Sequence, residues 1–178
     1  GWLATIGFSD FAGSTLVHST GGAAALAGII ILGPRFGRFD SKGNPKAIQP
    51  FAASSIPLVT IGVFVLWLGW FGFNGGSQLA LGSFADAVAI STIFINTNLA
   101  ACGGVLAAAV VTRLLFGKTD VIQMLNGAIG GLVAITAEPL APSPLAAILI
   151  GAVGGVIVVF GTKLLFSFKL DDVVGAIP

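Results

Sequence analysis

The sequence has 178 residues, of which 56% are hydrophobic and 8% are charged, and its formal net charge is +1. A soluble domain carries about 25% charged residues to wet its surface, so this composition, with a mean hydropathy of +1.03, excludes an ordinary soluble fold. The single cysteine, Cys102, lies within an apolar run and excludes a disulfide framework or a cysteine-based metal cluster, and the small net charge points to no nucleic-acid partner.

The apolar runs predict membrane-spanning helices. Residues 56–73 and 92–115 are continuously apolar, whereas a strand of a membrane barrel would alternate polar and apolar residues over about ten positions. In lipid every backbone polar group must be paired internally, which a helix achieves. The expected fold is therefore a single all-α integral membrane domain. Clusters of glycine, proline and polar residues divide it into five expected spans, at about residues 10–32, 53–73, 87–116, 121–137 and 145–168.

The basic residues give an independent indication of topology. With five spans, all eight lie on one side of the membrane, and the connections at about residues 74–86 and 138–144 contain neither lysine nor arginine. Because basic loops are retained in the cytoplasm, that side is predicted to be cytoplasmic and the membrane to be a plasma or inner membrane. The eight residues are Arg35, Arg38, Lys42, Lys46, Arg113, Lys118, Lys163 and Lys169.

Two polar residues of the first expected span need a reason to lie near hydrocarbon. His18 is the only histidine, and position alone leaves two roles open: a hydrogen bond between packed helices, or a place in a path for small polar molecules or protons. Asp10 lies near the other end of the span from the basic residues. It is expected to cap the helix start, and attraction of a cation to a pore mouth is the alternative.

The second expected span ends in a cluster of aromatic residues. Composition alone favours an interfacial aromatic belt. However, Trp70 and Phe73 are three residues apart and share a helix face, which Ser77 extends by a further turn. Aromatic faces beside a hydroxyl can hold a small cation such as ammonium.

Small residues are spaced four apart in the last two expected spans. Gly127 and Gly131 form one such pair, and Gly151 and Gly155 form another. Each pair lies on one helix face, which predicts close packing between helices rather than a dedicated dimer motif.

Five segments together resemble the ammonium transporter (Amt/Mep) family. Residues 10–18 and 33–40 resemble its signature, residues 68–77 its sixth transmembrane helix, residues 125–136 its eighth, and residues 169–178 the entry to its tenth. The segments follow one another in the family's order and cover essentially the whole chain.

The resemblance implies helices five to nine of an eleven-helix fold with two inverted repeats, assembled as a homotrimer with a pore through each subunit. It implies that His18 lines the pore and relays protons, and that Phe73 belongs to the pore gate. Trp70, Ser77 and Thr136 would form the ammonium site at the outer mouth. Leu66 would line the apolar channel, and Asp10 would be a structural residue near the vestibule.

The resemblance also implies the function, which is transport of ammonium or ammonia through a hydrophobic pore after deprotonation. A second pore histidine is expected beyond Pro178, so the chain is expected to be a fragment of a longer protein. The first alternative is an ammonium sensor coupled to a signalling output or to a P-II-type regulator, and the second is a purely structural helical subunit. One histidine, one cysteine and scattered acids form no catalytic set. We therefore expect no enzymatic activity, no metal and no cofactor.

Overall fold

The computed structural model describes residues 1–39 and 52–178, and every element in these ranges is helical. The basic residues Lys42 and Lys46 lie outside the described residues. The predicted all-α membrane fold is confirmed, because four helical segments are long and apolar enough to cross a membrane. In chain order the elements are α1 (Trp2–Thr5), the π-helix η1 (Ser14–Ser19), α2 (Thr20–Leu32), α3 (Ile56–Gly76), α4 (Phe84–Phe116), α5 (Val121–Ile135) and α6 (Pro144–Ser167).

Side chains just before the long helices satisfy their first N–H groups. The Ser55 hydroxyl accepts from the N–H of Leu58 at the start of α3, and Ser83 and Asp86 form a reciprocal capping box at the start of α4. Asp120 and Ser143 cap α5 and α6 in the same way. These caps fix the helix starts, so they also fix where each helix enters the bundle.

Helices α4, α5 and α6 form the packed core, and they touch backbone to backbone. A side chain at Gly104 would collide with the carbonyl of Gly127 in α5, and one at Gly151 would collide with the backbone of Ala100 in α4. Small residues permit this approach between membrane helices. Helix α3 packs on one side of the core, where Trp70 contacts Ala101 and Leu132.

Helix α5 is shorter than the span expected at residues 121–137. It has 15 residues and ends at Ile135, so it is roughly 22 Å long, whereas a membrane span needs about 20 residues. Pro139 accounts for the end, because its ring would clash with the carbonyl four residues before it, that of Ile135. The first span also differs from expectation, since its helix begins at Ser14 after a turn and not at Asp10.

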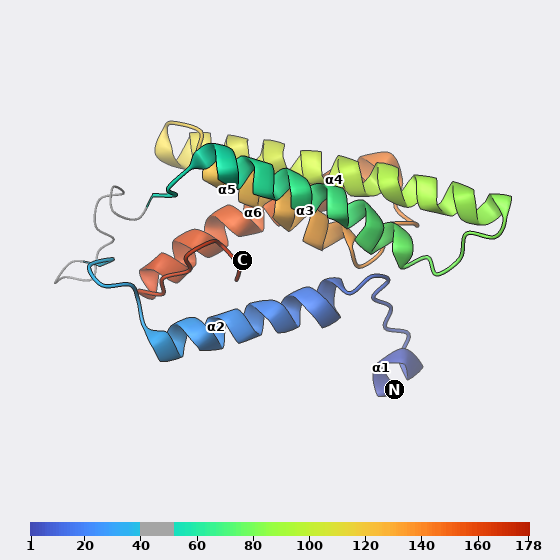
Figure 1. Cartoon of the computed structure of the whole chain (residues 1–178), viewed down its shortest axis with the longest axis horizontal. Coiled ribbons are helices and arrows are strands. Elements are labelled where there is room, and N and C mark those ends of the chain that lie inside the picture. Colours follow the sequence, from blue (N-terminus) through green and yellow to red (C-terminus); the bar gives the residue numbers. More distant parts are fainter. Residues whose placement is uncertain (40–51) are drawn as a thin grey trace.

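Helix α2 runs beside the bundle, and the C-terminal end of the chain lies between them (Figure 1). Helix α2 ends, α3 begins, α4 ends, α5 begins and α6 ends at the same end of the molecule. The described basic residues lie at or beyond these helix ends, and we call this end the basic end. They are Arg35, Arg38, Arg113, Lys118, Lys163 and Lys169.

Candidate functional site

A tight turn before η1 sets the position of His18. The Asp10 carboxylate accepts hydrogen bonds through Oδ2 from the N–H groups of Thr15 (3.0 Å) and Leu16 (2.8 Å), so it caps the start of the helix. Gly13 takes φ +102°, which a residue with a side chain rarely adopts. The π-helix that follows turns His18 toward α3, in keeping with the frequent occurrence of π-helical turns at functional sites.

His18 stacks on an aromatic face of α3. Its ring lies 5.0 Å from that of Trp70, at an interplanar angle of 14°, and 5.7 Å from that of Phe73. The two α3 rings are themselves 5.8 Å apart. The structure thus brings together three of the residues that the sequence singled out, from two segments more than fifty positions apart.

Thr136 holds the Trp70 side of this stack. Its Oγ accepts from the indole N–H of Trp70 (2.8 Å) and donates to the carbonyl of Leu132 (2.6 Å), and the residue is fully buried. Its own carbonyl accepts from the N–H of Ala12 (3.1 Å), in the turn before η1. Thr136 therefore ties both the Trp70 ring and the turn that carries His18 to the end of α5.

A cavity of about 700 Å³ opens beside the stack. His18 and Trp70 contribute to its lining, together with Ser14 and Gly22 near the start of the first span and Asn126 in α5. Most of its wall is apolar. The His18 Nε2 atom is buried and makes no hydrogen bond within the described residues. An imidazole nitrogen left unpaired beside a cavity can serve a small guest as donor or acceptor.

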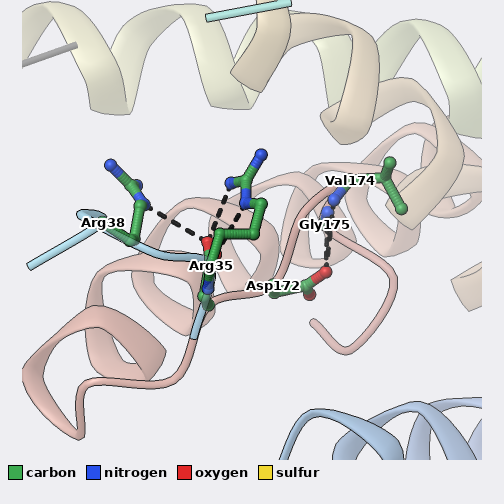
Figure 2. Close-up of polar contacts among 6 residues, drawn as sticks. Arg35, Arg38, Asp172, Val174 and Gly175 are labelled. Atoms are coloured by element: carbon green, nitrogen blue, oxygen red, sulfur yellow. Dashed lines mark hydrogen bonds and ion pairs between the residues drawn. The ribbon is translucent and has the colours of Figure 1, made fainter. Parts of the chain in front are cut away.

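The segment after α6 forms the wall of this cavity toward the basic end. Asp172 accepts hydrogen bonds through Oδ1 from the N–H groups of Gly175 (3.0 Å) and Ala176 (3.0 Å), and through Oδ2 from that of Ile177 (2.9 Å). These bonds curl the backbone that follows Asp172, and Figure 2 shows the contact with Gly175. Residues 175–178 line the cavity. We call residues 175–178 the tail turn.

The neighbouring residue Asp171 is buried and binds two arginines from the segment after α2, Arg35 and Arg38, which Figure 2 labels. Arg35 donates from Nε to Oδ2 (2.7 Å) and from a terminal nitrogen to Oδ1 (2.9 Å), and Arg38 donates from Nε to Oδ1 (3.2 Å). The hydrogen bonds from Arg35 hold the pKa of the Asp171 carboxyl below its usual value of 3.8 and raise the pKa of Arg35. Paired bonds of this kind are strong and directional.

A model of the Ammonium Transporter Family matches residues 1–178, the whole chain. The chain belongs to the ammonium transporter family. Among curated relatives of this family, the chain is 45% identical to the ammonium transporter Amt2 of Archaeoglobus fulgidus and 47% identical to the putative ammonium transporter sll1017 of Synechocystis. Each match covers 100% of this chain. The chain spans about two fifths of the length of these relatives, 39% and 40% respectively.

Solved structures agree with this membership. One titled "Sensor Amt Protein" is 37% identical, with a TM-score of 0.91 over 99% of this chain and 42% of that chain. The Mep2 structure from Candida albicans is 32% identical, with a TM-score of 0.84 over 99% of this chain and 37% of that chain. The resemblance to the Amt/Mep family drawn from the sequence is thereby confirmed.

Two further predicted residues, Leu66 and Ser77, belong to α3 and its C-cap and do not line the cavity. Ser77 follows the end of α3 and donates to the carbonyl of Phe73 (2.8 Å). Leu66 precedes Trp70 by one helical turn and is 55% exposed. Leu66, Trp70, Phe73 and Ser77 lie at helical spacing on one face of α3. Of the predicted site residues, all within the described ranges, His18 and Trp70 line the cavity.

Sequence reasoning missed the residues that hold the site. Asn126 donates to the carbonyl of Val174 (3.3 Å) and so fixes the tail turn from α5. Asp171 and Asp172 were recognised as part of a family segment but not as ligands of arginines and backbone N–H groups. The available signal was a pair of adjacent acids directly after an apolar span, where each charge needs a partner.

Proposed function

We propose that this chain forms part of the wall of a pore that conducts ammonium or ammonia across a membrane. The observation that carries the proposal is the His18 ring, which is held against Trp70 and Phe73 and keeps an unpaired, buried Nε2 beside the cavity. An unpaired buried polar atom is costly. Four other buried side-chain atoms of the described residues also lack a partner, so Nε2 supports the proposal because its ring lines the cavity.

The ability of ammonium to lose a proton explains why a histidine would line such a pore. Burying an ion in a medium of low dielectric costs several kcal/mol even after relaxation. Ammonium avoids this cost by losing a proton before the apolar passage, whereas potassium has no proton to lose. His18 would hold the neutral ammonia by a hydrogen bond and take part in relaying the proton. The proposed selectivity therefore depends on proton loss, and pore diameter contributes little.

Recruitment of the cation would take place on the aromatic face of α3, at the end opposite the basic end. Trp70 and Phe73 present ring faces there, and Ser77 adds a hydroxyl oxygen. Such faces attract a cation by about 0.5–2 kcal/mol. Because the Thr136 hydroxyl accepts from the Trp70 indole and donates to Leu132, we infer that Thr136 acts on this site by orienting Trp70. Leu66, one turn closer to the basic end, would extend the apolar wall.

The test uses the full-length protein reconstituted in proteoliposomes, with ammonium-driven current as the readout. His18→Ala should abolish the current or remove its selectivity over potassium. Thr20→Ala, at an exposed position that does not line the cavity, is the matched control and should conduct as wild type does. Wild-type current and selectivity in the His18→Ala variant would remove His18 from the mechanism.

The recruitment site is tested separately by the ammonium concentration that gives half-maximal current. Ser77→Leu and Trp70→Leu should raise this concentration severalfold. Trp67→Leu is the matched control, because Trp67 lies on the same helix and packs against the same core without contacting His18 in the described ranges. Equal rises in the Trp70 and Trp67 variants would count against the outer site.

One comparison favours a second candidate function, since a solved structure with a TM-score of 0.91 is titled a sensor. A sensor would bind ammonium without sustained flux. The same reconstituted protein distinguishes the two functions: saturable ammonium binding in calorimetry together with absent current would favour sensing. We place transport first because the relatives Amt2 and sll1017 are both named as transporters.

The proposed assembly is a homotrimer in which the basic end faces the cytoplasm. Apolar side chains exposed along the helices, such as Leu106, Leu149 and Val153, would contact lipid or neighbouring subunits. Light scattering of the full-length protein in detergent tests the trimer. A membrane-impermeant lysine reagent applied to intact cells tests the orientation, because Lys118 and Lys163 should react only after the membrane is opened.

A further inference from the structure

The segments that follow α2 and α6 are joined by charge at the basic end of the molecule. Asp171 comes from the segment after α6, and Arg35 and Arg38 come from the segment after α2, 133 or more positions away in the sequence. The Asp171 side chain is 1% exposed, and that of Arg38 is 11% exposed. The Arg38 guanidinium also lies 4.7 Å from the ring centre of Phe166, near the end of α6. The contact is thus a buried junction between the ends of two helices.

This junction is continuous with the wall of the cavity. Asp172 directly follows Asp171. Its carboxylate accepts hydrogen bonds from the backbone N–H groups of the tail turn and so orders that segment. The tail turn lies against α2, since a Cβ added to Gly22 would be 3.5 Å from the carbonyl oxygen of Ile177. Both Gly22 and Ile177 line the cavity that holds His18. A displacement of Asp171 would therefore move this part of the wall.

We propose that Asp171, Arg35 and Arg38 form a clamp that presses the tail turn against Gly22 and so sets the width of the conduction path at its basic end. The inference rests on the proposed function, and it assigns these three residues a positioning role. None of them needs to touch the guest. Their effect passes through the adjacent Asp172 and the tail turn to the part of the cavity between Gly22 and Ile177.

The two arginines bind the Asp171 carboxylate in different ways. Arg35 is the bidentate partner, with its side chain 38% exposed, and Arg38 adds a bond from a more buried position. A single exposed ion pair contributes little, but a buried carboxylate left without partners is strongly destabilising. Loss of one arginine leaves Asp171 partly paired, whereas loss of the carboxylate removes the partner that both arginines share. We therefore expect Asp171→Asn to disturb the tail turn more than either Arg35→Gln or Arg38→Gln.

The first arm of the test measures the clamp directly in the full-length protein. Cysteines are placed at Gly22 and Ile177, in a background without Cys102 and without any other cysteine of the protein, and copper-phenanthroline drives disulfide formation. The rate should fall about tenfold when Asp171→Asn is added. Lys118→Gln, which removes a charge from the same end, is the matched control and should leave the rate unchanged. An unchanged rate in Asp171→Asn would overturn the clamp.

The second arm measures ammonium current per folded protein, separately from the concentration that gives half-maximal current. Asp171→Asn should lower the maximal current about fivefold and leave the half-maximal concentration within twofold, because recruitment lies at the other end. Destabilisation alone would reduce the amount of folded protein and would not change the current of each folded molecule. The double variant Arg35→Gln with Asp171→Asn should be no worse than Asp171→Asn alone, since the residues act as one unit.

The outcomes separate the two proposals. If Asp171→Asn slows disulfide formation but leaves the maximal current unchanged, the positioning role is overturned and the proposed function still stands. If the losses of maximal current from Arg35→Gln and Asp171→Asn add in the double variant, the three residues do not act as one unit and the clamp is overturned. A wild-type protein that carries no ammonium current would refute the proposed function, whereas the disulfide rates would still decide whether Asp171 holds the tail turn against Gly22.

Discussion

Two turns beside the cavity share a short pattern but are anchored by different forces. In each, an aspartate is followed three residues later by a glycine with positive φ: Asp10 by Gly13 at +102°, and Asp172 by Gly175 at +74°. Each carboxylate accepts hydrogen bonds from backbone N–H groups that follow it. The first turn leads into the helix that carries His18, and the second is the tail turn.

The anchors of the two turns differ. The turn at Asp10 is tied to the end of α5 by uncharged backbone bonds, from the N–H of Phe11 to the carbonyl of Ala137 (2.8 Å) and from that of Ala12 to Thr136 (3.1 Å). The tail turn is tied by the neutral bond from Asn126 to Val174 and, in addition, by the ion pairs of the neighbouring Asp171. Neutral bonds do not depend on pH, whereas ion pairs do. The attachment to the rest of the molecule is therefore neutral for the first turn and partly ionic for the tail turn.

The largest predicted effect is a loss of folding stability when one methyl group is added to the turn at Asp10. In Gly13→Ala the new Cβ would lie 2.6 Å from a Val17 methyl group and would keep a strained φ, so we expect a loss of about 2–3 kcal/mol. Gly175→Ala should cost less, because its Cβ meets only the end of the Asn126 side chain, which can move at the loss of its bond to Val174. Thermal unfolding of the full-length protein in detergent measures both.

Gly82→Ala is the control for these two variants, since Gly82 lies in a connecting segment where an added Cβ meets nothing within 4 Å. It should melt as wild type does. Equal losses for Gly13→Ala and Gly175→Ala would contradict the proposed difference between the two turns.

A smaller effect distinguishes the two carboxylates. Asp10 uses only Oδ2, and its Oδ1 is buried without a partner among the described residues. Asp10→Asn keeps the needed acceptor and exchanges one unpaired polar atom for another, so it should cost about 0.5 kcal/mol. Asp172 uses both oxygens, so Asp172→Asn turns an NH₂ group toward an N–H and should cost about 1–2 kcal/mol. Unfolding in increasing denaturant measures the difference. A reversed order would show that charge, and not the number of acceptors, governs these caps.

The sequence was sufficient for much of the fold and for part of the site. Continuous apolar runs and few charges predicted membrane helices, and the helical spacing of Trp70, Phe73 and Ser77 predicted a shared face of α3. The glycines spaced four apart indicated close packing, which the contact of Gly151 with Ala100 confirms. These features depend on local periodicity, which one sequence contains.

Features that depend on contacts between distant segments were not predictable in the same way. Local spacing gave no reason for His18 to stack on Trp70, because the two lie on different helices. Nothing in the sequence indicated that the Thr136 hydroxyl accepts from Trp70 and donates to Leu132. Its expected place in the ammonium site stays a prediction. The start of the first helix at Ser14 depends on the π-helical turn, which hydrophobic periodicity does not reveal.

The smallest predicted effect is a change with pH in the melting-temperature difference between wild type and Asp171→Asn, and it tests the ion pairs of Asp171. Because Arg35 holds the pKa of Asp171 below its usual value of 3.8, the pair stabilises the folded state fully above about pH 4 to 5, and this contribution is lost as the pH falls through the lowered pKa. Between pH 7 and pH 5, wild type and Asp171→Asn should therefore keep a constant difference in melting temperature. Below about pH 4 the difference should shrink, because protonation removes from wild type the charge that the variant already lacks. Other carboxylates, Asp172 among them, titrate in both proteins and cancel in the difference. A gap that stays constant down to pH 3 would show that the ion pairs do not anchor the tail turn.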